Sequence, residues 1–396
     1  MNDTRHPSTP PRPLTVRWHD SIDQIDQRQW DRLALPLSTP LFEYRWLHHL
    51  EASGSITSRH GWQPNHLTAW SGQDLVGAVP LYLKNDSWGE FVFDHWWVRL
   101  AEKYQIRYYP KLVGMSPVTP SVGFRFLVAE HLDQRQVCLQ LLAAIDRFCQ
   151  ENEIPGCQLN FVDTAWFAAL DISGFIGWQH QSYLWENRGF NNFDDYLQTF
   201  KSSQRRNIRR EQRSMERQGI VIRALTGEEI PTTFGELMYR QYLNTNTRYG
   251  PWAARYLNAQ FFRRIFSDFR HRLLLFAAYL NGSVNPIALS MLLVKDGHLI
   301  GRYWGCDSPT KDLHFNMCYY QPINWAIANG IRTFDPGAGS PHKIMRGFAP
   351  VANTSLHRLY TPHLQALFAQ LIDQVNTMEQ AHIDELNEML PLANRR

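Results

Sequence analysis

The chain has 396 residues, of which 44% are hydrophobic and 19% are charged, and 40 Lys and Arg against 37 Asp and Glu give a net charge of +3. This composition indicates a globular protein of two or three domains, or of one duplicated domain, and excludes a disordered chain and a wholly basic nucleic-acid binder. The five cysteines show no CxxC spacing, so we expect buried free thiols and neither a disulfide scaffold nor a zinc site.

The first thirteen residues contain four prolines and no apolar run, so we expect a short disordered tail at 1–13 and no signal peptide. The apolar stretches further along are too short to span a bilayer. We therefore expect a soluble, cytoplasmic protein without stable membrane insertion.

The first half of the chain alternates strand and helix patterns. A capping box at Ser21 predicts a helix that runs to about Ala34. The segment 85–131 is aromatic and Pro-rich and is predicted to be irregular. The other predicted elements are strands at Thr15–His19, His66–Trp70, Leu75–Lys84 and Cys157–Val162 and helices at Leu41–Ala52 and Gln134–Glu151.

The second half repeats this plan, with glycine turns at equivalent places, Gly72 and Gly282. We expect two α/β units, over 14–178 and 179–360, with the boundary near Phe175–Ser182. The predicted elements of the second unit are strands at Leu273–Leu280, Ile287–Val294, His298–Trp304 and Ile331–Phe334 and a helix at Leu313–Ala328.

A last helix is predicted over 361–390, with Thr361 as N-cap and Pro362 in the first turn. Its apolar stripe should pack on the body of the protein rather than on a partner. The stripe consists of Leu364, Phe368, Leu371, Val375 and Met378.

The sharpest charge feature is a helix predicted over 201–218. Its residues 201–217 carry seven basic and two acidic side chains, a net charge of +5. Six of the seven basic side chains are Arg, which suits bidentate contacts to phosphate. Stacked cations on one helix face repel one another unless an anion is present, so the pattern favours an anion or nucleic-acid site over a merely solvated helix.

A second motif, DPGAGSPHKIMRGF (Asp335–Phe348), follows the last predicted strand of the unit. Its glycines allow the backbone to approach a ligand closely, and the loop is predicted to form a concave site of amide donors and cations. It is not a P-loop, because His342 stands where that motif requires Gly and Ile344 where it requires Ser or Thr.

The helix before this loop is bracketed by aromatic and polar residues. We expect His314, Asp335 and His342 to lie near one sheet edge. No GxSxG motif and no cysteine in a reactive context occurs, which disfavours a covalent acyl-enzyme. The pattern favours direct attack of a bound amine on a bound activated acyl group, which needs positioning, a proton acceptor and donors to the oxyanion.

Four segments resemble the FemAB-like family of peptidoglycan biosynthesis and recognition proteins, and the resemblance extends over roughly residues 15–360. They are HQSYLWENRGFNNFDDYLQTFKSSQRRNIRREQR (His180–Arg213), RYWGCDSPTKDLHFNMCYYQPINWAIANGI (Arg302–Ile331), FDPGAGSPHKIMRGF (Phe334–Phe348) and YYPKLVGMSPVTPSVGFRFL (Tyr108–Leu127).

The resemblance implies an α/β (α+β) fold of two tandem GNAT-like domains, each a mixed, mainly antiparallel sheet flanked by helices. Fem-type relatives transfer an amino acid from aminoacyl-tRNA to an amine of a peptidoglycan precursor. Neither half contains a convincing [QR]xxGx[GA] loop for acyl-CoA, so tRNA is favoured as the donor. We expect no metal and no tightly bound cofactor, with aminoacyl-tRNA or acyl-CoA as co-substrate and an amine-bearing peptide or cell-wall precursor as acceptor.

Residue roles follow from combining the resemblance with the motifs. Asp335, His314 or His342 would accept the proton. Phosphate would be bound by Arg205, Arg206, Arg209 and Arg210. The anionic part of the substrate or the oxyanion would be bound by Gly337, Gly339, Ser340, Lys343 and Arg346. The walls of the pocket would be formed by Tyr303, Trp304, Tyr319 and Tyr320.

The chain departs from the family pattern at several positions. Asn316 replaces an acidic residue, and the usual loop FEPGAQGEHK has Asp335 for Glu and Gly339, Ser340 and Pro341 for Gln, Gly and Glu. Two alternatives therefore stay open beside aminoacyl transfer. One is an acetyl- or acyl-CoA-dependent N-acyltransferase of the same fold, and the other is a non-catalytic binding protein for a nucleic acid or phosphate-bearing ligand.

Overall fold

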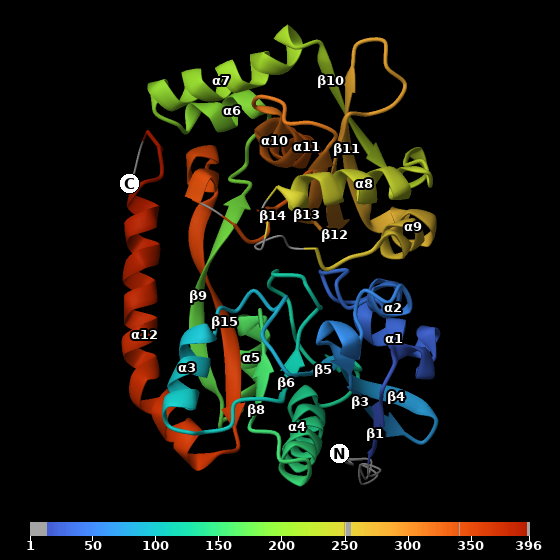
Figure 1. The fold of residues 1–396 in the computed structure, drawn as a ribbon, viewed down its shortest axis with the longest axis vertical. Coiled ribbons are helices and arrows are strands. Elements are labelled where there is room, and N and C mark those ends of the chain that lie inside the picture. Colours follow the sequence, from blue (N-terminus) through green and yellow to red (C-terminus); the bar gives the residue numbers. More distant parts are fainter. Residues whose placement is uncertain (1–13, 249, 251–254, 340, 394–396) are drawn as a thin grey trace, which may run out of the picture.

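The computed structural model describes residues 14–248, 250, 255–339 and 341–393 (Figure 1). The tail predicted at 1–13 and Ser340 of the glycine loop lie outside the described residues. The chain forms two units of similar plan, joined by long strands, and a C-terminal helix lies along one side of the molecule (Figure 1).

The N-terminal unit begins with a strand and two helices and ends with a long helix, a strand and a short helix. Its elements are β1 (Thr15–His19), α1 (Gln27–Ala34), α2 (Tyr44–Ala52), β2 (Gln63–Pro64), β3 (His66–Ser71), β4 (Asp74–Val79), β5 (Leu81–Lys84), α3 (His95–Lys103), β6 (Lys111–Gly114), β7 (Leu127–Val128), α4 (Gln134–Glu151), β8 (Gly156–Leu159) and α5 (Thr164–Leu170).

The C-terminal unit repeats the order of strand, two helices, antiparallel strands, helix and strand. Its elements are β10 (Ile220–Thr226), α8 (Phe234–Thr247), α9 (Ala259–Asp268), β11 (Leu273–Leu280), β12 (Ala288–Lys295), β13 (His298–Cys306), α10 (Leu313–Phe315), α11 (Gln321–Ala328) and β14 (Thr333–Asp335). The linking and final elements are β9 (Ile176–Glu186), α6 (Phe193–Gln198), α7 (Ser202–Arg217), β15 (Ala349–Leu359) and α12 (Pro362–Glu388).

One sheet of eleven strands runs through both units in the order β10-β11-β12-β13-β14-β9-β15-β8-β6-β5-β2, and β1, β3, β4 and β7 form a second sheet. The two long strands at the centre of the eleven-stranded sheet, β9 and β15, are exchanged between the units. β9 follows the N-terminal unit but pairs with β14, whereas β15 follows the C-terminal unit but pairs with β8. β9 and β15 also pair with each other, so the expected boundary near Phe175–Ser182 lies within a continuous strand.

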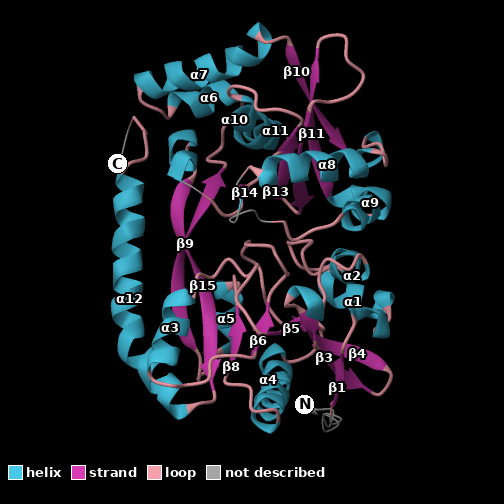
Figure 2. Ribbon diagram, in the orientation of Figure 1, coloured by secondary structure: helices cyan, strands magenta, loops and turns pink. Residues whose placement is uncertain are grey.

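Helices cover the sheet and bring the two units together. α8 and α9 lie against the C-terminal strands and α12 packs along β9 and β15 (Figure 2). α2 meets α9, where the rings of Trp46 and Phe261 lie 5.6 Å apart. The buried carboxylate of Glu43 is 2.8 Å from Lys295 Nζ and 2.9 Å from Arg272, so charged groups also join the units.

Several predicted elements have the bounds that the sequence indicates, namely β1, α4 and β11. The helix predicted from Ser21 begins later. Ser21 caps only a single turn at Ile22–Gln24, Ile25 is extended, and the Asp26 carboxylate accepts the hydrogen bond from Gln29 N that starts α1. The nearer Asp therefore supplies the N-cap.

The strand predicted at Leu75–Lys84 is divided at Pro80 into β4 and β5, which belong to different sheets. Proline has no N–H to continue the ladder, and the division lets one hairpin serve two sheets. The strand predicted at Cys157–Val162 ends at Leu159.

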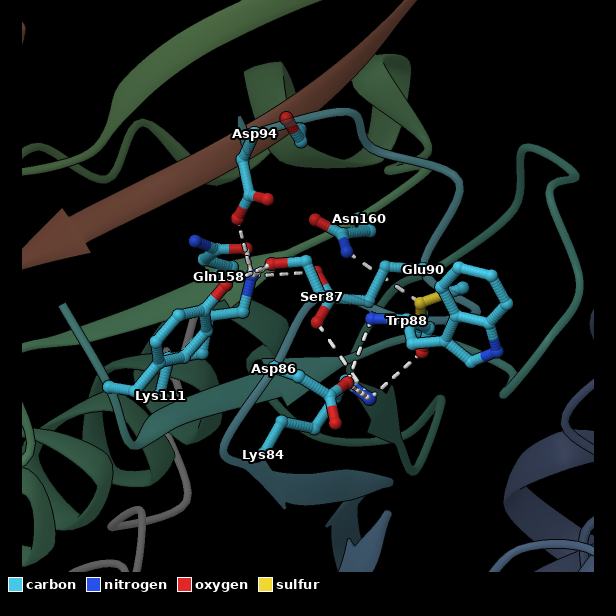
Figure 3. Close-up of polar contacts among 12 residues, drawn as sticks. Lys84, Asp86, Ser87, Trp88, Glu90, Asp94, Lys111, Gln158 and Asn160 are labelled. Atoms are coloured by element: carbon cyan, nitrogen blue, oxygen red, sulfur yellow. Dashed lines mark hydrogen bonds and ion pairs between the residues drawn. The ribbon is translucent and has the colours of Figure 1, made fainter. Parts of the chain in front are cut away.

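The segment 85–131, predicted to be irregular, contains α3, β6 and β7. β6 begins with the buried Lys111, whose Nζ lies 2.8 Å from Glu90 Oε2 and 2.6 Å from Asp94 Oδ2 (Figure 3). A charged residue within a short strand hides the apolar pattern on which strand prediction depends. Asp94 precedes α3, but its side chain makes no capping bond because it serves the ammonium group.

The helix predicted at Leu313–Ala328 is α10 and α11 joined by a π-helical turn at Asn316–Tyr320. α12 packs on the body as expected, with Leu364 and Phe368 buried, but Met378 is 65% exposed and does not belong to the contact. All five cysteines are free.

Candidate functional site

The candidate site lies where two parallel strands of the C-terminal unit separate. β13 and β14 pair in parallel up to Ile300 and Asp335, after which β13 continues beside β12 while the chain turns away at Pro336. A Cβ on Gly337, which has φ +77°, would lie 3.1 Å from Gly301 O. Glycine thus permits both the turn and the close approach of the two backbones.

A cavity opens on each face of the sheet at this point. The histidine cavity, of about 360 Å³, is lined by His314, Cys318, Tyr319, His342, Lys343 and Gly339. The tyrosine cavity, of about 240 Å³, is lined by Tyr242, Tyr256 and Gly337 from the other side. Both cavities share Arg302, Tyr303, Trp304, Pro336 and Ala338, so only the ends of the separated strands stand between them.

The two predicted histidines meet in the histidine cavity. The Tyr319 hydroxyl lies 2.9 Å from His342 Nε2 and 3.3 Å from His314 Nε2, and the His314 ring packs on Trp304 with centroids 4.6 Å apart. Burial, with nearby cations adding repulsion, lowers the pKa of His314 to about 3 and that of His342 to about 4. Both imidazoles are therefore neutral at neutral pH, and the same shifts make them weak proton acceptors.

Lys343 stabilises the glycine loop from within. Its buried Nζ donates at 2.8 Å to Gly337 O and at 2.8 Å to Ala338 O. Burial lowers the pKa of this ammonium to about 8, and the attraction of the Asp335 carboxylate offsets part of the effect. The loop is thus held over a lysine that carries a positive charge at neutral pH.

Arg346 and Tyr320 do not line either cavity. The Arg346 guanidinium forms an ion pair with Glu211 of α7, at 3.1 Å and 3.0 Å from its two carboxylate oxygens, and its Nε donates to the Tyr320 hydroxyl at 3.2 Å. The Tyr320 hydroxyl in turn donates to Glu211. These buried groups anchor the glycine loop to the basic helix and do not face a ligand.

Asp335 faces a third and larger cavity between the two units. Its Oδ2 accepts a hydrogen bond from the Ser121 hydroxyl of the N-terminal unit at 2.7 Å, and its Oδ1 accepts one from Gly337 N at 2.8 Å. Burial raises the pKa of Asp335, although both hydrogen bonds oppose the shift. The inter-unit cavity, of about 590 Å³, also includes Thr39, Arg125 and Ser182.

Sequence patterns did not identify Arg302, Ser121 or Arg125 as site residues. Arg302 lines both strand-end cavities, and one of its terminal nitrogens donates to Val118 O at 2.6 Å and to the Tyr303 hydroxyl at 2.8 Å. Its buried Nε has no hydrogen-bond partner within the described part of the chain. All three residues belong to the family-like segments of the sequence, but nothing in those segments shows which of their residues face a cavity.

The arginines of α7 lie outside these cavities. Arg206, Arg209 and Arg210 are exposed, and Arg205 donates to Phe200 O at 2.7 Å. Arg209 is 3.1 Å from Asp194 in an exposed ion pair. A separate groove of about 440 Å³ is lined by Arg209, Arg213, Gln212, Glu216 and the first residues of β10 and α11.

The chain belongs to the FemAB_like family, described as peptidoglycan biosynthesis/recognition, whose sequence profile matches residues 21–394. This membership associates the chain with peptidoglycan biosynthesis or recognition. A search of curated proteins finds no match.

Solved structures share the fold at low sequence identity. A structure of FemX aligns with a TM-score of 0.51 and 11% identity over 88% of this chain and 98% of that chain. The C-terminal domain of a protein assigned as a lysylphosphatidylglycerol synthetase from Agrobacterium fabrum aligns with a TM-score of 0.51 and 9% identity over 89% and 97% of the two chains. A tandem GNAT protein from the clavulanic acid biosynthesis pathway aligns with a TM-score of only 0.38 and 11% identity, over 88% of this chain and 99% of that chain.

The expected fold class, two tandem units of mixed, mainly antiparallel sheet flanked by helices with a C-terminal helix, is confirmed, and FemX shares this fold. Within the described residues, no helix is long and apolar enough to cross a membrane. In the same part of the chain, no group of three or more His, Cys, Asp or Glu side chains is arranged to hold a metal ion.

Proposed function

We propose that the protein transfers an activated acyl group to an amine, with the donor carbonyl at the separated ends of β13 and β14 and the amine entering from the inter-unit cavity. The position of Asp335 carries this proposal. Its carboxylate lines the inter-unit cavity, and the next residue, Pro336, lines both strand-end cavities. One carboxylate therefore lies between a space for the donor and a space for the acceptor.

The chemistry then needs no covalent enzyme intermediate. The amine nitrogen attacks the acyl carbon, a C–N bond forms, the bond from carbon to the ester or thioester leaving atom breaks, and Asp335 takes the proton from nitrogen. The raised pKa of Asp335 makes it a stronger base than an ordinary carboxylate. Arg302, which lines both strand-end cavities, supplies a positive charge that is suited to stabilise the carbonyl oxygen.

The other predicted residues take positioning roles in this proposal. Lys343 fixes the glycine loop through its carbonyls, and Arg346 fixes the same loop to α7 through Glu211. His314 and His342, neutral beside Tyr319, would hydrogen-bond the donor.

We propose aminoacyl-tRNA as the donor and a peptidoglycan precursor or similar peptide as the acceptor. The exposed arginines of α7 support the choice of donor, because a donor that contacts them outside the cavity must extend well beyond its acyl group. CoA as the donor would not require this exposed basic surface. Membership of a family described as peptidoglycan biosynthesis/recognition supports the choice of acceptor.

The test is transfer of a radiolabelled amino acid from bulk charged tRNA to a set of amine-bearing peptides, with acetyl-CoA as the alternative donor. We expect Asp335→Asn to reduce transfer by about 10²–10⁴-fold, and Arg206→Ala with Arg210→Ala to weaken tRNA binding in a salt-dependent manner. Transfer from acetyl-CoA alone would establish the acyl-CoA alternative, and full activity of Asp335→Asn would refute the assigned base.

A further inference from the structure

The inter-unit cavity contains a cation that the transfer step does not use. Arg125 enters the cavity from the N-terminal unit, just before β7. Its side chain is half-buried, its Nε is buried without a hydrogen-bond partner among the described residues, and its Cζ lies 6.0 Å from the centroid of the Trp166 ring. A guanidinium that lines a cavity without an ion-pair partner among the described residues is suited to bind an anion.

The neighbouring acidic and basic groups of the cavity are already engaged. The Asp163 carboxylate caps α5 by accepting a hydrogen bond from Trp166 N at 3.0 Å. His298 bonds Thr333 at 2.7 Å and Arg332 at 3.1 Å, and burial lowers its pKa. Arg125 therefore offers the unsatisfied positive charge on this side of the cavity, within the part of the chain that the structure describes.

The spacing between Arg125 and Asp335 limits what fits. Ser121, which bonds the Asp335 carboxylate, precedes Arg125 by four residues, so their Cα atoms can be at most about 14 Å apart. The walls between them carry hydroxyl groups, including those of Thr39 and Ser182. The cavity thus has an acceptor for an ammonium proton and, within the length of a short peptide, a donor to an anion.

We propose that Arg125 binds the free carboxylate of the acceptor, which is an amino acid or a short peptide whose amine lies at Asp335. This inference rests on the proposed function for the direction of the amine. A carboxylate matches a single guanidinium by a bidentate pair, whereas a diphosphate would call for several cations. The site therefore selects acceptors that carry both an amine and a free carboxyl group.

The experiment measures binding to the full chain without any donor. Dipeptides and tripeptides with a free carboxyl terminus, and the same peptides as C-terminal amides, are titrated up to millimolar concentration by calorimetry. Wild type is compared with Arg125→Gln, Asp335→Asn and the matched control Arg147→Gln, which changes an exposed arginine of α4.

We expect at least one carboxylate peptide to bind wild type and Arg147→Gln, and to bind at least about tenfold more weakly to Arg125→Gln or as its amide. Asp335→Asn should weaken the binding of acids and amides alike, because it removes the partner of the amine. Equal binding of acids and amides, unchanged binding by Arg125→Gln, or no binding of any peptide would overturn the inference. Displacement of the peptides by inorganic phosphate with higher affinity would also overturn it, since the anion would then be a phosphate.

The outcomes also separate this inference from the proposed function. Carboxylate-selective binding without transfer from any donor leaves the Arg125 assignment standing and removes the transferase proposal. If the protein transfers an acyl group and Arg125→Gln changes neither KM nor kcat, the transferase proposal stands and the Arg125 assignment is removed.

Discussion

Replacing Arg346 by Met tests whether this arginine serves the fold or a ligand. Both partners of the ion pair are buried, with side-chain exposures of 7% for Arg346 and 6% for Glu211. The substitution therefore leaves the Glu211 carboxylate buried without its cation. Breaking a buried ion pair from one side costs about 3–5 kcal/mol, a large share of a typical unfolding free energy of about 5–15 kcal/mol. We therefore expect a large fall in the urea midpoint of unfolding.

The double variant Arg346→Met with Glu211→Gln should recover most of this loss. The neutral amide still accepts the Tyr320 hydroxyl hydrogen bond and leaves no charge uncompensated. We expect a coupling energy of at least about 2 kcal/mol from the double-mutant cycle. Arg209→Met is the control. It breaks the exposed ion pair between Arg209 of α7 and Asp194 of α6, and it should lower the free energy of unfolding by less than about 1 kcal/mol.

Urea unfolding followed by tryptophan fluorescence, together with the transfer assay, decides the matter. If the free energy of unfolding of Arg346→Met lies within about 0.5 kcal/mol of that of wild type and the variant nevertheless loses transfer, Arg346 contacts a ligand and the positioning role is wrong. If the double variant is no more stable than Arg346→Met alone, the argument from an uncompensated carboxylate fails.

Three further predictions concern titration and buried charge. Since burial raises the pKa of Asp335, transfer by wild type should fall as pH drops through that raised pKa. Asp335→Asn should reduce kcat by about 10²–10⁴-fold above this pKa and by less below it, and a pH profile of kcat/KM for both proteins checks the prediction. The pKa of His314 falls from 6.5 to about 3 on folding, so between these two pH values the unfolded state binds more protons than the folded state. The free energy of unfolding should therefore decline as pH is lowered from 6.5 to about 3. Urea titrations should show a smaller decline for His314→Asn. Lys111→Met should cost about 3–5 kcal/mol, because Glu90 and Asp94 lose the cation that lies 2.8 Å and 2.6 Å from them, and an unfolding midpoint near that of wild type would contradict the charge assignment.

Local patterns in the sequence predict elements that are stable by their own chemistry. α4 shows a clean 3.6-residue pattern between the Asp133 N-cap and Asn152, and the structure has it at the predicted bounds. The Lys111 strand shows the limit of such patterns. The buried ammonium of Lys111 is neutralised by Glu90 and Asp94, which come from a segment that is predicted to be irregular. Burial of a charge depends on partners that are distant in sequence.

The candidate site shows the same division. The sequence predicted that His314, Asp335 and His342 would lie near one sheet edge. The two histidines share a cavity with Lys343 and Gly339, whereas Asp335 lines the inter-unit cavity. The sequence did not predict that Arg346 would pair with Glu211, or that Asp335 would meet Ser121 of the other unit. A cation looks the same in sequence whether it faces a ligand or a buried carboxylate.

Sequence patterns alone establish the duplicated order of strands and helices, the basic helix, the glycine loop and the family, because hydrophobic period, caps and motif residues act over a few neighbouring positions. The exchange of β9 and β15 between the units, and the cavity with Arg125 and Asp335 that lies between them, emerge only in three dimensions. The pairing partner of a strand and the surroundings of a charge depend on contacts between residues far apart in the chain, and no local pattern specifies them.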